Sequence, residues 1–583
     1  MNIRRLFDVL LFQNQERSQQ VSLAHKMDNQ WKTYSTEEVV KIANQLSTGL
    51  LKAGISPGEK IGLVSLNRPE WVIVDFAISQ IGAINVPMYP NSTAEDYAYI
   101  INDATVKMVF AGDDDLLTKL KKTETLVNHN ISLFSFDQGS DKYLWTNLLK
   151  DEIDHETIET LRSKIEYEDL ATIIYTSGTT GNPKGVMLSH KNILSNTAAV
   201  TKAFATGGPE HTVLSFLPLS HIFERTALYV YLHMGASIYF AESMDTIAEN
   251  MREVKPHFFA TVPRLLEKVY EKILVTGYEL QGVKKNLFFW ALNLAKKYDL
   301  DNNQGFFYNL QLTLANKIIF SKWRAALGGR VEFIVSGGAA LQPRLANIFW
   351  AAQIKVLEAY GLTETSPGIS FSLIDDLKVG CVGPLLDGIQ VKIATDGEVL
   401  VKGDNVMMGY YKRQDLTDEV IDNDGWFHTG DIGEMVDNHY LKITDRKKEM
   451  FKTSGGKYIA PQALENKFGE SLLIDQIMIV GEGQKFPGAL IVPNFEKLRT
   501  WCQHHNVNYT TDDEMIKNSE VVDKFEREIA SLNESFAQYE KIKKFRLLPQ
   551  HWTIENGEVT PKLSLKRKII KKNHQSVIDS IYS

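Results

Sequence analysis

The stretch Lys60–Met88, KIGLVSLNRPEWVIVDFAISQIGAINVPM, decides the fold class. Its two ends, Lys60–Ser65 and Ala83–Met88, are short apolar runs rich in β-branched residues and predict strands. The residues between them, Pro69–Ile81, have the length and pattern of a helix. A strand, a helix and a second strand in this order form a βαβ unit, whose strands lie parallel in one sheet. We therefore expect an α/β protein.

Similar strands alternate with helical patterns through the first three quarters of the chain. They are expected at Met108–Ala111, Thr172–Tyr175, Val213–Leu217, Phe258–Val262 and Phe333–Ser336. Such alternation predicts stacked, mostly parallel sheets covered by helices. From about Gly383 the pattern changes, because Gly and Asp turns separate short alternating runs such as Gln390–Ile393 and Gly397–Lys402. We expect a small distorted β-barrel at about 380–440.

A dense charge run at Leu441–Met450, LKITDRKKEM, separates this part from the C-terminal segment. Beyond it the chain has strands of its own at Gln476–Gly481 and Ala489–Pro493, and a helix at Val521–Tyr539. A charged run between two self-contained patterns is typical of a linker between domains. The expected layout is a large N-terminal domain at 1–444, a hinge at 445–448 and a small, mobile α+β domain at 449–583.

Composition and charge narrow the class of protein. The chain has 583 residues, with 64 Lys and Arg against 72 Asp and Glu, a formal net charge of −8. Apolar residues make up 44% and charged residues 23%, which excludes a disordered, collagen-like or coiled-coil protein. The acidic balance argues against nucleic-acid binding, because its field repels phosphate. Two cysteines, Cys381 and Cys502, are too few for a disulfide framework and fit a reducing, intracellular location.

No segment predicts secretion or membrane insertion. In the N-terminal sequence MNIRRLFDVLLFQNQER, Asp8 interrupts the apolar stretch and no small-residue cleavage site follows, which argues against a signal peptide. The nearest candidate for a membrane span, Thr226–Ala241, is shorter than the ~20 residues required and contains His233 and Gly235. We expect a cytoplasmic protein, soluble or peripheral to the inner face of the membrane.

The strongest chemical signal is Tyr175–His190, YTSGTTGNPKGVMLSH. A strand ends at Tyr175, and a loop rich in Gly, Ser and Thr follows and closes with Lys184. Glycines let backbone N–H groups turn toward an anion, hydroxyls add donors, and the lysine adds positive charge. Gly185 stands where a Walker A loop would have Ser or Thr, so the loop is of another kind. We interpret it as a phosphate-binding loop, the alternative being a simple turn.

The loop resembles the phosphate-binding motif of the adenylate-forming (AMP-binding) superfamily, which includes acyl-CoA synthetases, luciferases and peptide-synthetase adenylation domains. Further stretches follow in that family's order along nearly the whole chain. They are Leu217–Arg225 (LPLSHIFER), Ser336–Leu341 (SGGAAL), Tyr360–Thr365 (YGLTET), Gly425–Gly433 (GWFHTGDIG), Asp445–Pro461 (DRKKEMFKTSGGKYIAP) and Asn556–Arg567 (NGEVTPKLSLKR). LPLSHIFER, SGGKYIAP and TPKLSLKR resemble the long-chain fatty acid branch in particular.

The resemblance implies a two-step ligase. A long-chain fatty acid and Mg²⁺-bound ATP would give acyl-adenylate and pyrophosphate, and the thiol of CoA would then release AMP after the small domain rotates about Lys448. Joining two anions requires preorganised cations and N–H donors, with Mg²⁺ as the usual helper. The oligomeric state, including a homodimer, stays open.

The resemblance also assigns the site residues of the large domain. Glu364 and Thr176 would bind Mg²⁺, the alternative for Glu364 being a solvated turn. Tyr360 would stack on adenine, Gly338 and Gly361 would border the nucleotide, and Thr365 would contact the α-phosphate. The phosphate loop would comprise Thr176, Ser177, Gly178, Thr179, Thr180, Gly181 and Lys184.

In the C-terminal part, Asp431 would bind the ribose diol, because a short carboxylate suits two hydroxyls; a simple turn aspartate is the alternative. Arg446 would be its basic partner, Lys448 the pivot, and Lys452 a residue that changes role on rotation. Lys566 would be the adenylation lysine. This chain has Ser564–Leu565 before it, where many relatives have Ser–Gly, so Lys562, Lys568 and a solvated basic face remain alternatives.

Two further segments allow two interpretations each. His221 is assigned to gating of the acyl substrate, with core packing as the alternative, because a carboxylate nucleophile needs no general base. Lys284–Lys297, KKNLFFWALNLAKK, is either a buried helix or a surface helix that inserts Phe289 and Trp290 into lipid.

Other functions stay open as well. A fatty acid–AMP ligase or an acyl–acyl carrier protein synthetase would share the adenylation step. A non-catalytic sensor of fatty acid or nucleotide is disfavoured by the intact set Lys184, Glu364, Asp431 and Lys566.

Overall fold

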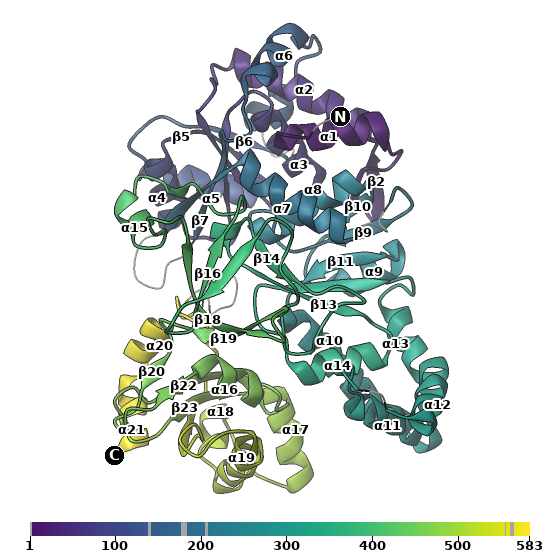
Figure 1. The fold of residues 1–583 in the computed structure, drawn as a ribbon, viewed down its shortest axis with the longest axis vertical. Helices are drawn as coiled ribbons and strands as arrows, with labels where there is room; N and C mark the ends of the chain where they lie inside the picture. The colour runs from purple at the N-terminus through teal and green to yellow at the C-terminus, as the bar shows by residue number, and fades with distance from the viewer. Residues whose placement is uncertain are drawn as a thin grey trace. The chain divides into compact units, whose positions relative to one another are not determined.

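The computed structural model describes residues 3–137, 141–176, 183–204, 208–302, 304–553, 556–559 and 565–583 (Figure 1). The chain divides into two compact units. The first comprises 1–392, 400–428 and 436–441, and the second 393–399, 429–435 and 442–583.

The βαβ unit predicted at Lys60–Met88 lies at the centre of a seven-stranded sheet in the first unit. Strands β3 and β4 pair in parallel from Lys60 opposite Ile84 to Val64 opposite Met88. The sheet order is β17 (Gly409–Tyr410), β8 (Lys184–Ser189), β7 (Leu170–Thr176), β4 (Ile84–Met88), β3 (Lys60–Val64), β5 (Val106–Ala111) and β6 (Ser132–Ser135). The strands from β7 to β6 are parallel, β8 runs antiparallel to β7, and the edge strand β17 runs antiparallel to β8.

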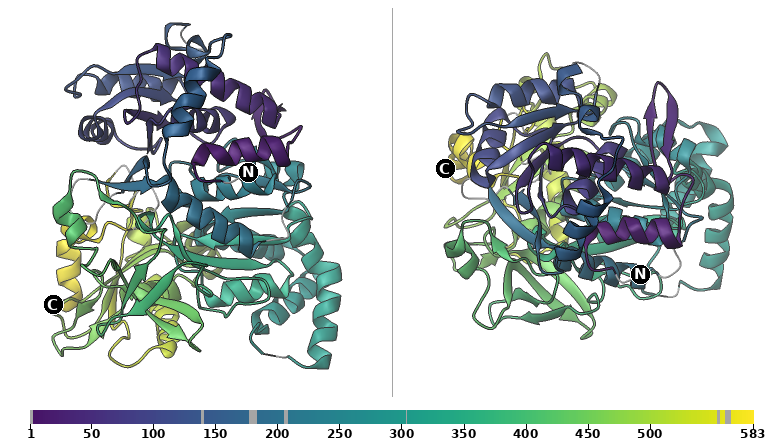
Figure 2. Two further views of the ribbon diagram at one scale, coloured as in Figure 1. Left: turned by 45° about the horizontal axis from the view of Figure 1, so that its top comes forward. Right: turned by 90° about the horizontal axis from the view of Figure 1, so that it is seen from above.

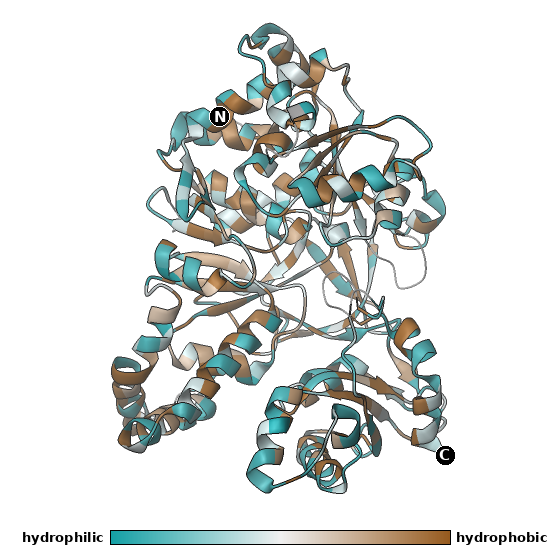
Figure 3. Ribbon diagram, turned by 180° about the vertical axis from the view of Figure 1, so that it is seen from behind, coloured by the Kyte–Doolittle hydropathy of each residue, from teal (hydrophilic) through white to brown (hydrophobic). Residues whose placement is uncertain are grey.

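The same unit contains an eight-stranded sheet that is also parallel except at its edges, where β14 and β2 run antiparallel. Its order is β14 (Gly368–Phe371), β13 (Val356–Gly361), β12 (Phe333–Gly337), β11 (Phe258–Thr261), β9 (Thr212–Ser215), β10 (Ser237–Phe240), β1 (Leu23–Met27) and β2 (Gln30–Tyr34). Hydrophobic residues, brown in Figure 3, dominate the inner strands of both sheets. The expected α/β class with mostly parallel sheets is confirmed.

Helices α1, α3, α7 and α8 contact one another, and their side chains share one core with both sheets. Helix α1 is the purple helix beside the N label in Figure 2. The helices of this unit are α1 (Leu6–Glu16), α2 (Thr36–Lys52), α3 (Pro69–Ser79), α4 (Ala94–Ala104), α5 (Asp114–Thr123), α6 (His155–Lys164), α7 (His190–Ala203), α8 (Ile222–Met234), α9 (Ile247–Val254), α10 (Pro263–Glu279), α11 (Gly282–Lys297), α12 (Phe306–Ala315), α13 (Ser321–Ala326), α14 (Pro343–Ala351) and α15 (Gln414–Asp418).

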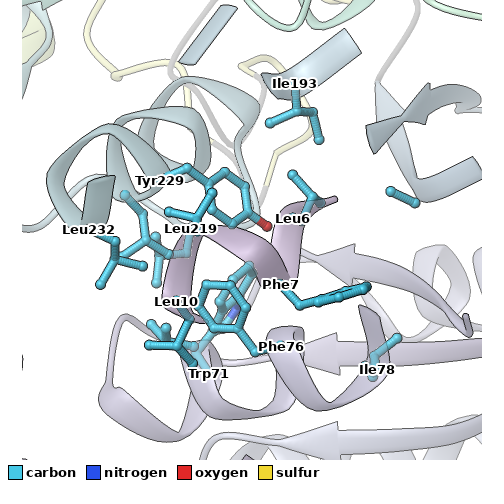
Figure 4. Close-up of a cluster of buried hydrophobic side chains, with 14 of the residues drawn as sticks. Leu6, Phe7, Leu10, Trp71, Phe76, Ile78, Ile193, Leu219, Tyr229 and Leu232 are labelled. Carbon is cyan, nitrogen blue, oxygen red and sulfur yellow. The ribbon is translucent and has the colours of Figure 1, made fainter. Parts of the chain in front are cut away.

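Helix α3 explains why this layer is stable. It begins at Pro69, whose missing N–H costs nothing at a helix start, and every one of its residues is buried. A helix that is covered on every side lies in the protein interior. Trp71 and Phe76 of α3 meet Leu6 and Phe7 of α1 and Tyr229 of α8 in the core of Figure 4. Each such buried side chain contributes about 1.5–3 kcal/mol.

An ion pair lies inside this apolar layer. Asp75 of α3 and Arg225 of α8 are 2% and 1% exposed, and Arg225 Nη2 lies 2.5 Å from Asp75 Oδ1. Tyr229 Oη and Asn85 Nδ2 also donate to the Asp75 carboxylate, at 2.5 and 2.7 Å. Arg225 Nη1 donates to Thr172 Oγ1 on β7 at 2.8 Å. The network therefore joins α3, α8, β4 and β7.

Glu224, one residue before Arg225, is buried without a cation. Its Oε1 accepts a hydrogen bond of 2.6 Å from Ser215 Oγ, which in turn accepts one from Asn67 Nδ2. Oε2 has no hydrogen-bond partner among the described residues. Burial raises the pKa of Glu224 to about 8, so its carboxyl is protonated at neutral pH.

This proton makes stability depend on pH. A carboxyl whose pKa is higher in the folded than in the unfolded state stabilises the fold fully below about pH 4, and this contribution is lost as the pH rises toward about 8. Glu224→Gln keeps the shape and removes the titration. We therefore expect the wild type to lose several degrees of melting temperature between about pH 6 and about pH 9 relative to Glu224→Gln. The exposed Glu168→Gln is the control; equal slopes for all three proteins would contradict the prediction.

The region expected to form a distorted barrel contains a four-stranded sheet. Its order is β15 (Gln390–Ile393), β16 (Glu398–Lys402), β18 (Phe427–Val436) and β19 (Tyr440–Arg446). The two runs predicted there, 390–393 and 397–402, correspond to β15 and β16.

The second unit has its own core around a small sheet, as expected for a small α+β domain. Strand β22 (Ile474–Val480) pairs antiparallel with β23 (Gly488–Pro493), which pairs in parallel with β24 (Lys544–Leu547). A hairpin of β20 (Phe451–Lys452) and β21 (Tyr458–Ile459) precedes it. The helices are α16 (Pro461–Phe468), α17 (Phe495–His505), α18 (Asp512–Met515), α19 (Ser519–Leu532), α20 (Arg567–Asn573) and α21 (Gln575–Tyr582).

The helix predicted at Val521–Tyr539 is too long, because α19 ends at Leu532. Asn533 ends it: its side-chain amide donates to the carbonyl of Ile542 and accepts from the N–H of Ile542, both at 2.9 Å. An asparagine side chain that pairs with distant backbone competes with helix continuation. Among the residues that the structure describes, no helix is long and apolar enough to cross a membrane.

Candidate active site

The phosphate-binding loop joins two antiparallel strands, β7 and β8. Thr176 lies directly opposite Lys184 at its mouth, and Tyr175 lies opposite Gly185. Gly185 must be glycine, because a Cβ there would lie 2.8 Å from Ile173 Cγ2 and 3.1 Å from Tyr175 Cζ. The other expected loop residues lie outside the described residues. They are Ser177, Gly178, Thr179, Thr180 and Gly181.

Helix α4 contacts residues on both sides of the loop. Tyr175 Oη donates to Asp103 Oδ2 at 2.5 Å, and Tyr99 Oη donates to the carbonyl of Pro183 at 3.2 Å. The rings of Tyr99 and Tyr175 meet edge to face with centroids 6.3 Å apart. These contacts fix Tyr175, on the strand before the loop, and Pro183, just before Lys184. Nothing in the local sequence indicates this, since α4 is more than 70 residues away from the loop.

The turn that carries Glu364 follows strand β13. Gly361 is required there, because a Cβ would lie 1.7 Å from the carbonyl oxygen of Pro367. Thr365 is fully buried: its hydroxyl accepts from the N–H of Leu362 at 2.9 Å and donates to the carbonyl of Pro367 at 2.5 Å. In this structure Thr365 therefore stabilises the turn that presents Glu364. Tyr360 is half-buried on β13, and Gly338 has a φ of +81°, which favours glycine.

Tyr410 connects the phosphate loop to Glu364. Its Oη donates to Glu364 Oε1 at 2.9 Å, and Lys184 Nζ lies 4.9 Å from the centroid of its ring. Strand β17 places it there by pairing with β8, so that Tyr410 lies opposite Val186. The N–H of Met407 also donates to the carbonyl of Glu364 at 2.8 Å. Burial and the Glu364 carboxylate raise the pKa of Tyr410, which keeps its hydroxyl a donor.

Tyr410 is a site residue that the sequence analysis missed. Its signal is the run Gly409–Tyr410–Tyr411, in which Gly409 has a φ of +133° and lies against Thr417. A glycine that only fits without a side chain, next to an aromatic residue, marks a specific approach of two segments. The structure thus brings together a hydroxyl, a cation, an aromatic ring and a carboxylate, which belong to Thr176, Lys184, Tyr410 and Glu364 in that order.

We expect Tyr410→Phe to lower kcat/KM for ATP by about 10- to 100-fold, because a hydrogen bond to a charged group contributes about 1.5–3 kcal/mol. The ring and its contact with Lys184 remain, so the protein should fold normally. Tyr440→Phe is a matched control, since Tyr440 Oη also donates to a carboxylate, Asp376, at 2.9 Å outside the candidate site. Equal activity of the two variants in a steady-state assay with varied ATP would contradict the role of Tyr410.

His221 lies at the start of α8, where its Nδ1 accepts a 3.1 Å hydrogen bond from the N–H of Phe223. The segment before it is held by Asn67, which donates to the carbonyl of Leu217 at 2.6 Å and accepts from the N–H of Leu219 at 3.0 Å. The ring is half-buried. The structure thus gives His221 a helix-capping contact, which is compatible with either interpretation.

The expected residues of the second unit begin with Asp431, which is 5% exposed. Arg446 Nε lies 3.5 Å from Asp431 Oδ1, and the Arg446 side chain is exposed. Lys448 is exposed. The Lys452 ammonium lies 4.5 Å from the centroid of the Tyr458 ring across the β20–β21 hairpin.

Lys566 lies immediately before α20 and is half-buried. Its N–H donates to the carbonyl of Glu558 at 2.8 Å, and Leu565 forms a β-bridge with Val559. The neighbouring Arg567 forms ion pairs with Glu465 and, at 3.1 Å, with Glu449. These pairs fix the backbone that carries Lys566. The alternative Lys562 lies outside the described residues, and Lys568 is exposed on α20.

The first unit thus combines two mostly parallel sheets with the linked set Lys184, Tyr410 and Glu364, and the second unit has an α+β fold of its own. The AMP-binding enzyme family matches residues 12–411, and the AMP-binding enzyme C-terminal domain matches residues 449–583. The chain therefore belongs to the AMP-binding enzyme family.

The relatives of this chain narrow its place within the family. The chain is 31% identical to a long-chain-fatty-acid–CoA ligase of Mycobacterium tuberculosis over 566 residues, which cover 96% of this chain and 93% of the relative. It is also 31% identical to long-chain-fatty-acid–CoA ligase 1 of Homo sapiens over 594 residues, which cover 96% of this chain and 84% of the relative. The resemblance to the long-chain branch of the family is thus confirmed.

Solved structures share the fold. One is the A domain of a carboxylic acid reductase from Segniliparus rugosus, in complex with AMP and a co-purified carboxylic acid. It has a TM-score of 0.75 and 21% identity, with 99% of this chain and 94% of that chain covered. Another is the anthranilate CoA ligase AuaEII in complex with anthranoyl-AMP, with a TM-score of 0.71 and 17% identity, covering 98% of this chain and 97% of that one.

Proposed function

We propose that this protein is an AMP-forming ligase that converts long-chain fatty acids to acyl-CoA. A carboxylate oxygen of the acid attacks the α-phosphorus of ATP, and pyrophosphate leaves. The CoA thiol then loses its proton and attacks the acyl carbon, and AMP leaves. The observation that carries the proposal is the linked set Lys184, Tyr410 and Glu364 in a chain similar over nearly its full length to proteins named as long-chain-fatty-acid–CoA ligases.

The first unit supplies the phosphate end of the reaction. Lys184 and the loop after Thr176 bind the phosphates of ATP, and the Tyr410 ring restricts where the Lys184 ammonium can lie. Glu364 and the Thr176 hydroxyl offer the hard oxygen atoms that Mg²⁺ prefers, so these two residues would hold it. When bound, Mg²⁺ would neutralise charge on the phosphates as the carboxylate approaches. Tyr360, Gly338 and Gly361 border the adenosine, and Thr365 supports the turn beneath the α-phosphate.

The second unit supplies the ribose contact and the adenylation lysine. Asp431 binds the ribose hydroxyls with Arg446 beside it, and Lys566 reaches the carboxylate and the bridging phosphate oxygens. The domains are taken as 1–444 and 449–583, with a hinge at 445–448. Rotation about Lys448 removes Lys566 after adenylation and brings Lys452 to the second step.

We also propose that the protein is cytoplasmic and contacts the inner face of a membrane near Lys284–Lys297, because its substrate partitions into lipid. We further propose that it forms a homodimer. Light scattering after size exclusion would test the latter, since a mass near that of one chain, 66.0 kDa, would exclude it.

The decisive experiment measures pyrophosphate and AMP release with Mg²⁺-ATP and palmitate, octanoate, acetate or benzoate, each with and without CoA. CoA-dependent AMP formation that is highest with palmitate is the expected result. Acid-dependent pyrophosphate release without CoA stimulation would instead indicate a carrier protein as acceptor. An absence of turnover with every acid would refute the ligase and favour a sensor.

A further inference from the structure

One region of the first unit exposes an unusual number of large apolar side chains. Fifteen such side chains are exposed among the described residues, and seven of them lie between Tyr278 and Leu314. Four form a single strip on α12, which we call the α12 stripe: Phe306, Phe307, Leu310 and Leu314, with exposed fractions of 76%, 78%, 60% and 52%. Soluble surfaces rarely gather apolar side chains in this way without a partner.

The neighbouring helix α11, for which the sequence allows either a buried helix or one that inserts Phe289 and Trp290 into lipid, turns most of its apolar side chains inward. Phe288, Leu292 and Leu294 are buried, and Phe289 and Trp290 are half-buried. Phe288 fits against Gly277 of α10, where a Cβ would lie 2.0 Å from its ring. The prediction of a buried helix therefore applies to the inner face of α11. In the first turns of this helix, the apolar side chains of Val283 and Leu287 are exposed.

Helix α12 has the opposite arrangement. Its inner face packs on α11: Tyr308 Oη donates to the carbonyl of Leu294 at 2.7 Å, and Ala315 is buried. At 3.6 residues per turn the four residues of the α12 stripe fall within an arc of about 100° on the other side. The helix, FFYNLQLTLA, contains no charged residue. The polar residues beside the exposed strip are Asn309, Gln311 and Thr313.

The charges around the stripe are basic, in contrast to the whole chain. Between 281 and 331 there are eight Lys and Arg and two Asp, a local charge of +6 in a chain of −8. The two carboxylates, Asp299 and Asp301, lie in the loop before α12, where Asp299 accepts hydrogen bonds from Asp301 N–H and Asn302. Lys284, Lys317 and Lys322 are exposed, and none has an ion-pair partner among the described residues.

We propose that the α12 stripe, with Val283 and Leu287, docks on the surface of an anionic lipid bilayer. Apolar side chains would enter the boundary between headgroups and acyl chains, and the surrounding lysines would bind acidic headgroups. A second copy of the chain fits this surface poorly, because two such regions would bring +6 against +6. The inference rests on the proposed function and deepens it by locating the membrane contact.

The test is vesicle co-sedimentation of the full chain without nucleotide or acid, using phosphatidylcholine vesicles with and without about 30% phosphatidylglycerol. We expect binding to the anionic vesicles that weakens as salt rises from about 50 mM to about 500 mM. The variant Phe306→Ser/Phe307→Ser should bind at least about tenfold more weakly. Lys317→Glu/Lys322→Glu should lose binding to anionic vesicles at low salt.

The matched control is Leu126→Ser/Met244→Ser, which removes two side chains that are 49% and 59% exposed elsewhere in the first unit. It should bind as the wild type does. Melting temperatures of all variants check folding, and ligase activity with fatty acid dispersed in detergent should be the same for all, which separates this inference from the proposed function. Binding that is unchanged in the Phe306/Phe307 variant, or no binding of the wild type, overturns the proposal. The proposal is also overturned if the wild type does not bind vesicles and the Phe306/Phe307 variant changes the oligomeric mass. A second copy of the chain would then cover the stripe.

Discussion

Replacing Lys566 by alanine is expected to reduce acyl-adenylate formation by about 10²- to 10³-fold, the usual loss when a group that stabilises transition-state charge is removed. Adenylation brings a carboxylate to a phosphate, and Lys566 is the cation proposed to offset their repulsion. The second step should be affected little, because it begins after the negative charge has left with pyrophosphate. The measurement is the single-turnover rate with palmitate and Mg²⁺-ATP, compared with thioester formation from synthetic palmitoyl-adenylate and CoA.

Two lysines near Lys566 serve as controls for this result. Lys568 is exposed on α20 two residues away, so Lys568→Ala removes the same charge from the same helix. Lys562→Ala addresses the other alternative in the motif. A large loss confined to Lys562→Ala or to Lys568→Ala would move the adenylation lysine to that position, and equal small losses in all three variants would identify a solvated basic face.

Replacing Asp75 by leucine is expected to destabilise the first unit by about 3–5 kcal/mol. The change removes the acceptor of Arg225, Tyr229 and Asn85 and leaves a fully buried guanidinium without its counter-ion. Urea unfolding followed by tryptophan fluorescence would report the loss, since Trp71 lies on the same helix and the Arg225 guanidinium lies 5.6 Å from its ring.

The exposed pair Lys202–Asp387 gives the matched control, with side chains 77% and 64% exposed. Asp387→Leu should change stability by less than about 1 kcal/mol, because exposed ion pairs contribute little. The double variant Asp75→Leu/Arg225→Met should recover part of the loss, since it leaves no buried charge. A single variant as stable as Asp387→Leu would contradict the role assigned to the network.

The parts of the fold that the sequence predicts are those with a local signal. Strands β3 and β4 are continuous apolar runs because both faces of a parallel sheet are covered, and α3 between them is buried on all sides. The phosphate loop and the Glu364 turn are equally local, because their glycines and polar residues follow one another in the chain.

Tyr410 and the Tyr175–Asp103 contact could not be predicted in this way. Each depends on two segments far apart in the chain, and the sequence of one segment does not specify the other. The same reason explains why the sequence allows both a buried and a lipid-inserting arrangement of α11, whereas packing buries its inner face and leaves the α12 stripe exposed. The amphipathic direction of a helix depends on the neighbours available to cover it.

The ion pairs of Arg567 have a consequence for protein engineering. Arg567 joins Glu449, at the start of the C-terminal segment, to Glu465 of α16, and Glu465 is 8% exposed. A chimera that exchanged only the last twenty residues with a relative, or only the segment before α16, would separate these charges and leave a buried carboxylate unpaired. The natural unit of exchange therefore runs from Glu449 to the C-terminus, and libraries built on this scaffold should vary residues 449, 465 and 567 together or not at all.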